Sequence, residues 1–354
     1  MTDFPVLERF AYLNAGTLGP LAASTLAAME ERTRFDQGLG RGGKAWYESV
    51  FELRARVREL VASLVGAPAD RIALTDSTTD GCNIVLGGFP FEAGDEVVTT
   101  DAEHPGLLAP LHASGARVRV AQVAARPAAE VLDRIMAAVT PRTRLLALSH
   151  VLWTTGQVMP VHELRAATGV PVLVDGAQSI GAIPFDVGEL DFYTVSGQKW
   201  LCGPESTGAL YVRDPELLHV ARPNYFSLKT IEQDGMYVPK DGALRFDSGW
   251  TATAALAGLE AALAAAPEDR FLRAARAAAW CREGLAAAGF DVVTPPDQAT
   301  LVTWVARGVA AEDAARLYER GVIVRDLPGT SWLRASCGWW TTDEHIERLV
   351  AALA

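Results

Sequence analysis

Strand-length apolar runs alternate with helix-length patterns across residues 60–212. This alternation is typical of a mostly parallel β-sheet wrapped by helices, because neighbouring parallel strands need a crossover connection that is usually a helix. The sequence therefore predicts an α/β fold. Strands are expected at 71–75, 96–100, 117–123, 144–150, 170–174 and 191–196, and helices at 78–86, 106–114, 128–139 and 161–168.

The rest of the chain is organised differently. Residues 223–245 are polar and irregular and are predicted to form a long loop. Short strands and helices in mixed order then follow, which is typical of a small α+β domain. We expect a large sheet domain over 16–245 and a small domain formed by 1–15 and 246–354. The elements of the small domain are expected at 253–265, 270–288, 299–305, 311–320, 322–325, 332–336 (an edge strand) and 343–352.

The charge balance limits the possible partners. The chain has 32 basic and 43 acidic residues and a net charge of -11, whereas nucleic-acid binders normally present a basic surface. The most membrane-like stretch, 250–266, contains Glu260 and has too few strongly apolar residues to span a bilayer. The N-terminus lacks the pattern of a signal peptide. We predict a cytoplasmic protein that binds a small-molecule substrate, with no nucleic-acid or membrane partner.

The cysteines form neither a metal-ligand nor a disulfide pattern. They are spread along the chain without C-x-x-C spacing, which argues against a zinc ribbon and a disulfide scaffold and fits a reducing compartment. We predict no metal site. The residues are Cys82, Cys202, Cys281 and Cys337.

A phosphate-binding motif is present only in part. Residues 38–44, GLGRGGK, match part of a P-loop, but Ala45 stands where the motif needs Ser or Thr for magnesium. The segment also follows a helical pattern rather than a buried strand. We interpret it as a flexible glycine loop near a binding site.

Two charged side chains follow strands of the predicted sheet. Asp175 comes directly after 170–174, and Lys199 comes shortly after 191–196. Ligands of such sheets bind beyond the carboxyl ends of the strands. Taken singly, Asp175 is equally typical of a helix N-cap, and Lys199 of a solvated loop. Lys199 is one of only four lysines, and burial beside Trp200 would favour its neutral, nucleophilic form.

Hydroxyl groups and an imidazole are predicted at the same edge. Strand 71–75 runs into Ser77, Thr78 and Thr79 at the start of a helix, where free backbone N–H groups can bind phosphate. Ordinary N-capping would also explain these residues. His104 follows the next strand. An acid, a lysine, a phosphate cup and a flat imidazole together predict a site for pyridoxal 5'-phosphate (PLP).

Motifs span nearly the whole chain: YLNAG, STTDG, EHPG, SHVLWTTGQVMPV, VLVDGAQSIG, SGQKWLCGP and WLRASCGWWTT. On these motifs the chain resembles the class V aminotransferase family, the cysteine-desulfurase-like branch of the fold type I PLP enzymes. The resemblance implies a large, mostly parallel, seven-stranded sheet domain with a small α+β C-terminal domain. It also implies a homodimer with the site at the interface, so that Trp250 or Thr251 reaches the neighbouring subunit's phosphate.

The resemblance also implies roles for individual residues. Lys199 is the Schiff-base lysine, Asp175 the partner of the pyridine nitrogen, and His104 the ring that stacks on the cofactor; these are the implied catalytic residues. The other implied cofactor contacts are Gln178 at the 3-hydroxyl, and Ser77, Thr78, Thr79, Ser196, Gln198 and Thr251 around the phosphate. The implied substrate-binding residues are Arg334, which clamps the α-carboxylate with its planar guanidinium, Arg325 and Asn14.

One departure from the family narrows the predicted reaction. Cysteine desulfurases carry a nucleophilic cysteine before the carboxylate-binding arginine, whereas segment 325–334 has none and Cys337 lies beyond Arg334. The runs WTTGQVMP and KWLCGP most resemble the cystine lyases of the family. We predict a C–S β-lyase that acts on a cysteine- or cystine-type substrate without a catalytic persulfide cysteine. The alternatives are a class V aminotransferase and an amino-acid epimerase, which use the same lysine.

Arg325 has two alternative interpretations. It lies nine residues before Arg334 and can bind a second, distal carboxylate of the substrate. An arginine that forms a salt bridge at a strand end would fit the sequence equally well.

Overall fold

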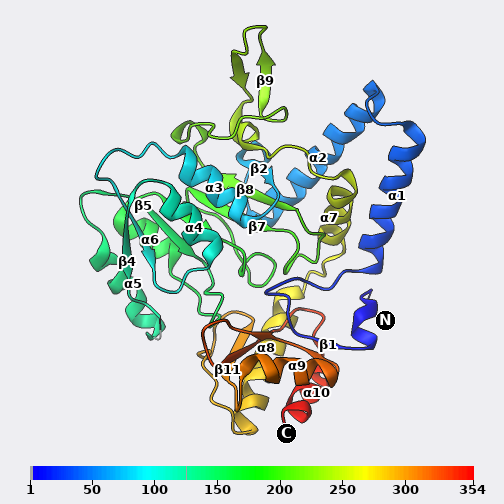
Figure 1. The fold of residues 1–354 in the computed structure, drawn as a ribbon, viewed down its shortest axis with the longest axis vertical. Helices are drawn as coiled ribbons and strands as arrows, with labels where there is room; N and C mark the ends of the chain where they lie inside the picture. The colour runs from blue at the N-terminus through cyan, green and yellow to red at the C-terminus, as the bar shows by residue number, and fades with distance from the viewer. Residues whose placement is uncertain (1–2, 125) are drawn as a thin grey trace.

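The computed structural model describes residues 3–124 and 126–354, and a seven-stranded β-sheet lies at its centre (Figure 1). The strand order is β2-β8-β7-β6-β5-β3-β4. Strand β8 is antiparallel to β2 and β7, and the other neighbouring pairs are parallel. The predicted α/β fold with a mostly parallel sheet is confirmed. The strands are β2 (Ile72–Thr75), β3 (Glu96–Thr100), β4 (Arg117–Ala121), β5 (Thr143–Ser149), β6 (Val172–Asp175), β7 (Phe192–Ser196) and β8 (Gly208–Val212).

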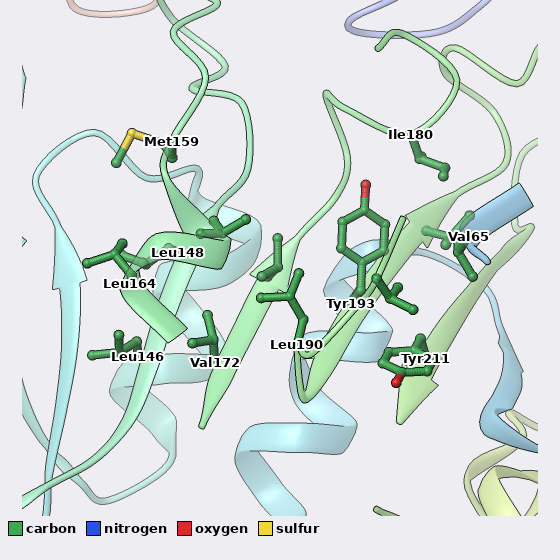
Figure 2. Close-up of a cluster of buried hydrophobic side chains, with 14 of the residues drawn as sticks. Val65, Leu146, Leu148, Met159, Leu164, Val172, Ile180, Leu190, Tyr193 and Tyr211 are labelled. Carbon is green, nitrogen blue, oxygen red and sulfur yellow. The ribbon is translucent and has the colours of Figure 1, made fainter. Parts of the chain in front are cut away.

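Helices cover both faces of this sheet, because its central strands are apolar on both sides. In β5, Leu146 and Leu148 pack into one core cluster, while Leu145 and Ala147 pack into the other. Figure 2 shows the first cluster. The helices of this part of the chain are α1 (Ala23–Leu39), α2 (Lys44–Val65), α3 (Thr78–Gly88), α4 (Pro105–Ala113), α5 (Ala128–Ala138), α6 (Val161–Thr168) and α7 (Thr253–Ala265).

A hairpin stands where the sequence predicted a long loop. Strands β9 (Leu228–Ile231) and β10 (Tyr237–Pro239) pair antiparallel and project from the large domain (Figure 1). Gly235, in the left-handed region with φ +89, follows Asp234 and donates its N–H to the carbonyl of Glu232 at 3.0 Å. The loop prediction was wrong because an Asp-Gly turn can join two short strands even where the residues are polar.

A second, three-stranded sheet forms in the C-terminal part. Its order is β11-β14-β13, and both pairs are antiparallel. Strand β14 (Trp332–Ser336) is central, since it pairs with β11 (Leu301–Val305) and with β13 (Arg325–Asp326). The prediction of an edge strand at 332–336 was therefore wrong. The helices packed around this sheet and its neighbours are α8 (Arg270–Ala287), α9 (Ala310–Glu319) and α10 (Asp343–Leu353).

The predicted strand 322–325 is divided between two partners. Strand β12 (Val322–Ile323) pairs in parallel with β1 (Ala11–Tyr12) near the N-terminus, while β13 pairs with β14. Short 3₁₀ helices complete the description at Pro5–Glu8, Ala69–Arg71, Pro215–Leu217 and Gly242–Phe246. No helix among the described residues is long and apolar enough to cross a membrane.

Two contacts bear on the predicted domain division. Ala11 and Leu13 lie in the core of the C-terminal part, as expected for an N-terminal strip that belongs with the small domain. Helix α7, which the division assigns to the small domain, packs against α1 and α2 of the large one. The division into 16–245 and 1–15 with 246–354 stays a proposal.

Candidate active site

Asp175 and Lys199 lie at the carboxyl ends of two adjacent parallel strands. Asp175 ends β6 and pairs in register with Thr194 of β7, and Lys199 lies in the turn after β7. Asp175 is buried, and its Oδ1 accepts from the N–H of Ala177 at 2.9 Å. Among the described residues no hydrogen-bond partner is found for its Oδ2. The structure thus brings an acid with a free oxygen and a lysine to one sheet edge.

The amine of Lys199 is poised to lose its proton. Burial lowers the pKa of Lys199 from 10.5 to about 8; the negative charge of Asp175 opposes this shift, and the positive charge of Arg334 adds to it. These three ionisable groups therefore lie close enough to act on one another. An amine with this pKa is partly neutral near physiological pH and can act as a nucleophile or a base.

His104 is the N-cap of α4. Its Nδ1 accepts from the N–H of Gly106 at 3.0 Å, and its ring packs edge-to-face on Trp153 with the centroids 5.2 Å apart. Burial, with the charge of Lys199 as the next cause, lowers the pKa of His104. The imidazole is therefore neutral and fixed in orientation beside the lysine.

The N-terminus of α3 forms a cup of hydroxyl and backbone N–H groups. Ser77 caps the helix, with its Oγ accepting from the N–H of Asp80 at 3.1 Å, and Thr78 and Thr79 begin the first turn. Free N–H groups at such a turn, together with the helix dipole, favour an anion. The residues at the start of α3 are thus placed to bind a phosphate.

Two glycines show how closely the neighbouring segments approach this cup. A Cβ at Gly208 would lie 3.1 Å from the backbone nitrogen of Ser77, and Gly208 pairs in register with Ser196. The hydroxyl of Ser196 donates to Oε1 of Gln198 at 3.0 Å. A Cβ at Gly106 would lie 2.5 Å from Oγ1 of Thr79 and 3.0 Å from Nδ1 of His104.

Gln178 links the segment after β6 to the N-terminal strip. Its Nε2 donates to the carbonyl of Gly16 at 2.9 Å, and its Oε1 accepts from Nε1 of Trp200 at 3.0 Å. Trp200 was predicted only to lower the local dielectric. Its role as a hydrogen-bond donor that orients Gln178 was missed, because residues 22 positions apart are brought together only by the fold.

Arg334 is a buried cation for which the described residues supply no carboxylate partner. It is 2% exposed, and its Nη1 donates to the carbonyl of Trp153 at 2.6 Å. Its Nε has no hydrogen-bond partner, and no carboxylate lies within 4.0 Å of its guanidinium in residues 3–124 and 126–354. Burial and the charge of Arg325 lower its pKa. An unpaired buried charge is costly, so the site is built to receive an anion.

Arg325 and Asn14 flank Arg334. Arg325 on β13 pairs in register with Arg334 on β14 and forms no ion pair within the described part of the chain. Asn14 forms a bridge with Ser336, and its Oδ1 accepts from Oγ1 of Thr17 at 2.9 Å. Three separate segments therefore meet around one guanidinium.

No contact found in the described chain places Thr251 with this group. Thr251 lies in the irregular segment before α7, and no hydrogen bond of its side chain to the other predicted residues is found in the described chain. The preceding Trp250 is 57% exposed and stacks on Trp46, with the ring centroids 5.8 Å apart.

Glu103 is a functional candidate that the sequence did not single out. Its buried carboxyl accepts from Oγ1 of Thr100 at 2.6 Å and from the N–H and Oγ of Ser149 at 2.8 and 2.5 Å. Burial raises its pKa to about 7, against these hydrogen bonds. Ser149 pairs in register with Asp175, so Glu103 ties the segment carrying His104 to the strand end beside Asp175.

All four cysteines are buried and form no disulfide among the described residues. Hydrogen bonding to Cys281 and burial raise the pKa of Cys337. Within the described residues no group of three or more His, Cys, Asp or Glu side chains is arranged to hold a metal ion.

The assembled groups are complementary to PLP. The free oxygen of Asp175 suits a protonated pyridine nitrogen, the amine of Lys199 an aldehyde, the ring of His104 a flat heterocycle, and the cup at α3 a phosphate. The fold and this site together define a PLP enzyme of fold type I.

Comparison with known proteins identifies the family. The chain belongs to the class V aminotransferases, because the model named Aminotransferase class-V matches residues 12–349. It is therefore a PLP-dependent enzyme of this family, and the predicted family and cofactor are confirmed.

Three relatives show how broad the similarity is. A probable cysteine desulfurase of Xylella fastidiosa (strain 9a5c) is 29% identical, with 99% of this chain and 93% of the relative covered. The isopenicillin N epimerase of Streptomyces clavuligerus is 30% identical, with 96% and 93% covered. A structure of the cystine C–S lyase C-DES with its product cysteine persulfide has a TM-score of 0.91 at 31% identity, with 99% of this chain and 98% of that chain covered.

Proposed function

We propose that this enzyme is a C–S β-lyase that acts on cysteine- or cystine-type amino acids without a catalytic cysteine. One observation carries the proposal. Segment 325–334, where a desulfurase would hold its nucleophile, has no cysteine, and all four cysteines of the chain are buried. The similarity to the cystine C–S lyase C-DES supports the same reaction class.

We infer which residues bind the cofactor from the geometry of the site. When bound, PLP supplies an electron sink for the charge that develops at the substrate Cα. We propose that Asp175 keeps the pyridine nitrogen protonated, that His104 stacks on the ring and that Gln178 contacts the 3-hydroxyl. The phosphate would be held by Ser77, Thr78, Thr79, Ser196 and Gln198, with Thr251 supplied by a second subunit.

The substrate is positioned by the buried arginine. Arg334 binds the α-carboxylate with two parallel hydrogen bonds, while Asn14 lies beside it. This fixes the Cα–H bond near the Lys199 amine, which takes the proton as a general base. The Cβ–S bond then breaks. With L-cystine and one water, the products are cysteine persulfide, pyruvate and ammonia.

Product analysis tests this function. The holoenzyme incubated with L-cystine or S-alkyl-L-cysteines should release pyruvate and ammonia in equal amounts. Transfer of the amino group to a keto acid without pyruvate would identify a transaminase instead. Accumulation of the D-amino acid would identify an epimerase.

The assembly and compartment are part of the same proposal. We propose a cytoplasmic homodimer, measurable by light scattering as twice the chain mass of 37.8 kDa. The exposed, stacked pair Trp250 and Tyr225 supports an interface next to Thr251, since exposed apolar patches mark contact surfaces.

The rate of PLP uptake by the apoenzyme should depend on the protonation of Lys199. Only the neutral amine attacks an aldehyde, so the rate should rise with pH and level off above about 8, the lowered pKa of Lys199. Asp175→Asn removes the charge that raises this pKa and should move the midpoint to lower pH. The measurement is the growth of the visible cofactor band after mixing. A rate that keeps rising to about pH 10, as for an ordinary lysine, would contradict the assignment.

Substituting Arg325 should change substrate preference rather than overall activity. Arg325→Gln should raise KM for L-cystine about 10- to 100-fold, because a charged hydrogen bond to the distal carboxylate is lost. S-methyl-L-cysteine has only one carboxylate, so its KM should change less than about twofold by the same reasoning. Arg117→Gln, at the exposed end of β4, is the matched control. Equal losses for both substrates would show that Arg325 serves only to support Arg334.

A further inference from the structure

A mostly apolar cavity of about 480 Å³ lies beside the candidate active site. This volume is within the range of about 300–1,000 Å³ that is typical of small-molecule pockets. None of the proposed cofactor- or substrate-binding residues lines it. The walls are formed by Asp101, Ala102, Ala124, Arg126, Pro127, Leu152, Thr154, Thr155, Gln157, Val293, Pro295 and Trp332.

The cavity adjoins the site along three different segments. Ala102 lies two residues before His104 in the connection between β3 and α4. Thr154 follows Trp153, whose carbonyl accepts from Arg334 and whose ring packs on His104. Because alternate residues of a strand share a face, Trp332 points to the same side of β14 as Arg334.

Two hydrogen bonds join segments that contribute residues to the cavity wall. Thr303 Oγ1 of β11 donates to the carbonyl of Thr154 at 2.5 Å, and Thr294 Oγ1 donates to that of Thr155 at 2.7 Å. These bonds fasten the wall that contains Val293 to the loop after β5. The cavity therefore lies where these two segments are joined by hydrogen bonds.

One wall carries an unpaired donor. Gln157 is 4% exposed, and its Nε2 has no hydrogen-bond partner among the described residues. A buried amide without a partner is unusual in a protein core, and ligand pockets carry a few polar groups of this kind among apolar side chains.

We propose that this cavity binds the group attached to sulfur in the substrate, so that the enzyme cleaves cysteine S-conjugates with apolar aryl or aralkyl groups. The inference rests on the proposed C–S lyase function and names a substrate class for it. An amino acid held at Arg334, with its Cα–H at Lys199, can direct its remaining substituent toward the adjoining cavity. Arg325, on the neighbouring strand β13, is not part of its wall.

The reaction balances with water alone. For S-benzyl-L-cysteine the Cα–H and Cβ–S bonds break, the sulfur leaves with a proton as benzyl thiol, and one water completes hydrolysis to pyruvate and ammonia. No oxidant or reductant is needed.

The test compares three substrates in three proteins. The substrates are S-benzyl-L-cysteine, S-methyl-L-cysteine and L-cystine, and the proteins are the wild-type holoenzyme, Val293→Phe and Val309→Phe. Val293 is half-buried in the cavity wall, so a phenyl ring there fills space that the benzyl group would occupy. Val309 is 59% exposed before α9 and provides the same substitution away from the cavity.

The wild type should favour the benzyl over the methyl substrate by at least tenfold in kcat/KM, since an apolar pocket discriminates by about 10- to 200-fold. Val293→Phe should remove this preference, while cleavage of S-methyl-L-cysteine and L-cystine stays within about twofold by the same reasoning. Val309→Phe should behave as the wild type. Calorimetry should show that benzyl thiol binds to the wild-type holoenzyme and not to Val293→Phe.

The possible results distinguish the proposed lyase function from the proposed role of the cavity. Pyruvate from all three substrates with no benzyl preference, and no effect of Val293→Phe, would overturn the cavity assignment and leave the lyase function intact. No pyruvate from any substrate would overturn the lyase function and the substrate class together. If Val293→Phe does not fold, Trp332→Leu is the second variant. It removes the indole ring from the cavity wall and should raise KM for the benzyl substrate alone.

Discussion

Replacing Lys199 with alanine is expected to lower kcat/KM for pyruvate release by at least about 10³-fold, because the variant loses both its nucleophile and its general base. The visible band of the holoenzyme should also shift, since the cofactor can no longer bond to the protein. The fold should persist, because burying the lysine already disfavours its charged form, as its lowered pKa shows.

Lys44→Ala is the matched control for this variant. Lys44 begins α2, and its side chain is 89% exposed. The control should keep the activity and spectrum of the wild type. Full activity of Lys199→Ala would show that another residue removes the Cα proton.

Replacing Arg334 with methionine should separate activity from stability. Loss of a buried charge–carboxylate contact costs about 2–5 kcal/mol, or roughly 30- to 4,000-fold in kcat/KM. In the free enzyme, however, Arg334 has no carboxylate partner among the described residues. Apolar replacement of a buried charge is often neutral or stabilising by about 1–4 kcal/mol.

The thermal midpoint of Arg334→Met should therefore equal or exceed that of the wild type, although the hydrogen bond to the Trp153 carbonyl is lost. Calorimetry of the free protein measures this. Arg117→Met, on the exposed end of β4, is the control and should change neither quantity. A large loss of stability with unchanged KM would mean that Arg334 is a structural residue and not the substrate clamp.

The sequence was sufficient to place Asp175 and Lys199 together. Both follow strands of a parallel sheet, and the carboxyl ends of such strands meet at one edge by construction. The cup at α3 was predictable for the same reason, since Ser77 combines a strand end with a helix start. Both predictions follow from the local sequence pattern and from the rule that ligands bind beyond the carboxyl ends of the strands.

The contacts that complete the site could not be predicted in this way. The bonds from Arg334 to Trp153 and from Gln178 to Gly16 join residues separated by 181 and 162 positions. Side-chain chemistry alone does not select such partners among many equivalent backbone carbonyls. Only the packing of the N-terminal strip and the C-terminal sheet against the large domain brings them together.

The wrong strand predictions in the C-terminal part arise from strand pairing. We predicted residues 322–325 as one strand, but Val322 and Ile323 pair in parallel with β1, whereas Arg325 pairs with β14. This division makes β14 central and places Arg325 opposite Arg334. Pairing partners depend on the whole topology, because any strand edge can satisfy the same backbone groups.

We propose that Lys199 is the residue that holds the cofactor at this sheet edge. Reducing the holoenzyme with borohydride, digesting it and sequencing the peptides by mass spectrometry tests it most directly. We expect the phosphopyridoxyl group on the peptide that contains Lys199. Modification of Lys44, Lys229 or Lys240 in its place, or of no lysine at all, would contradict it.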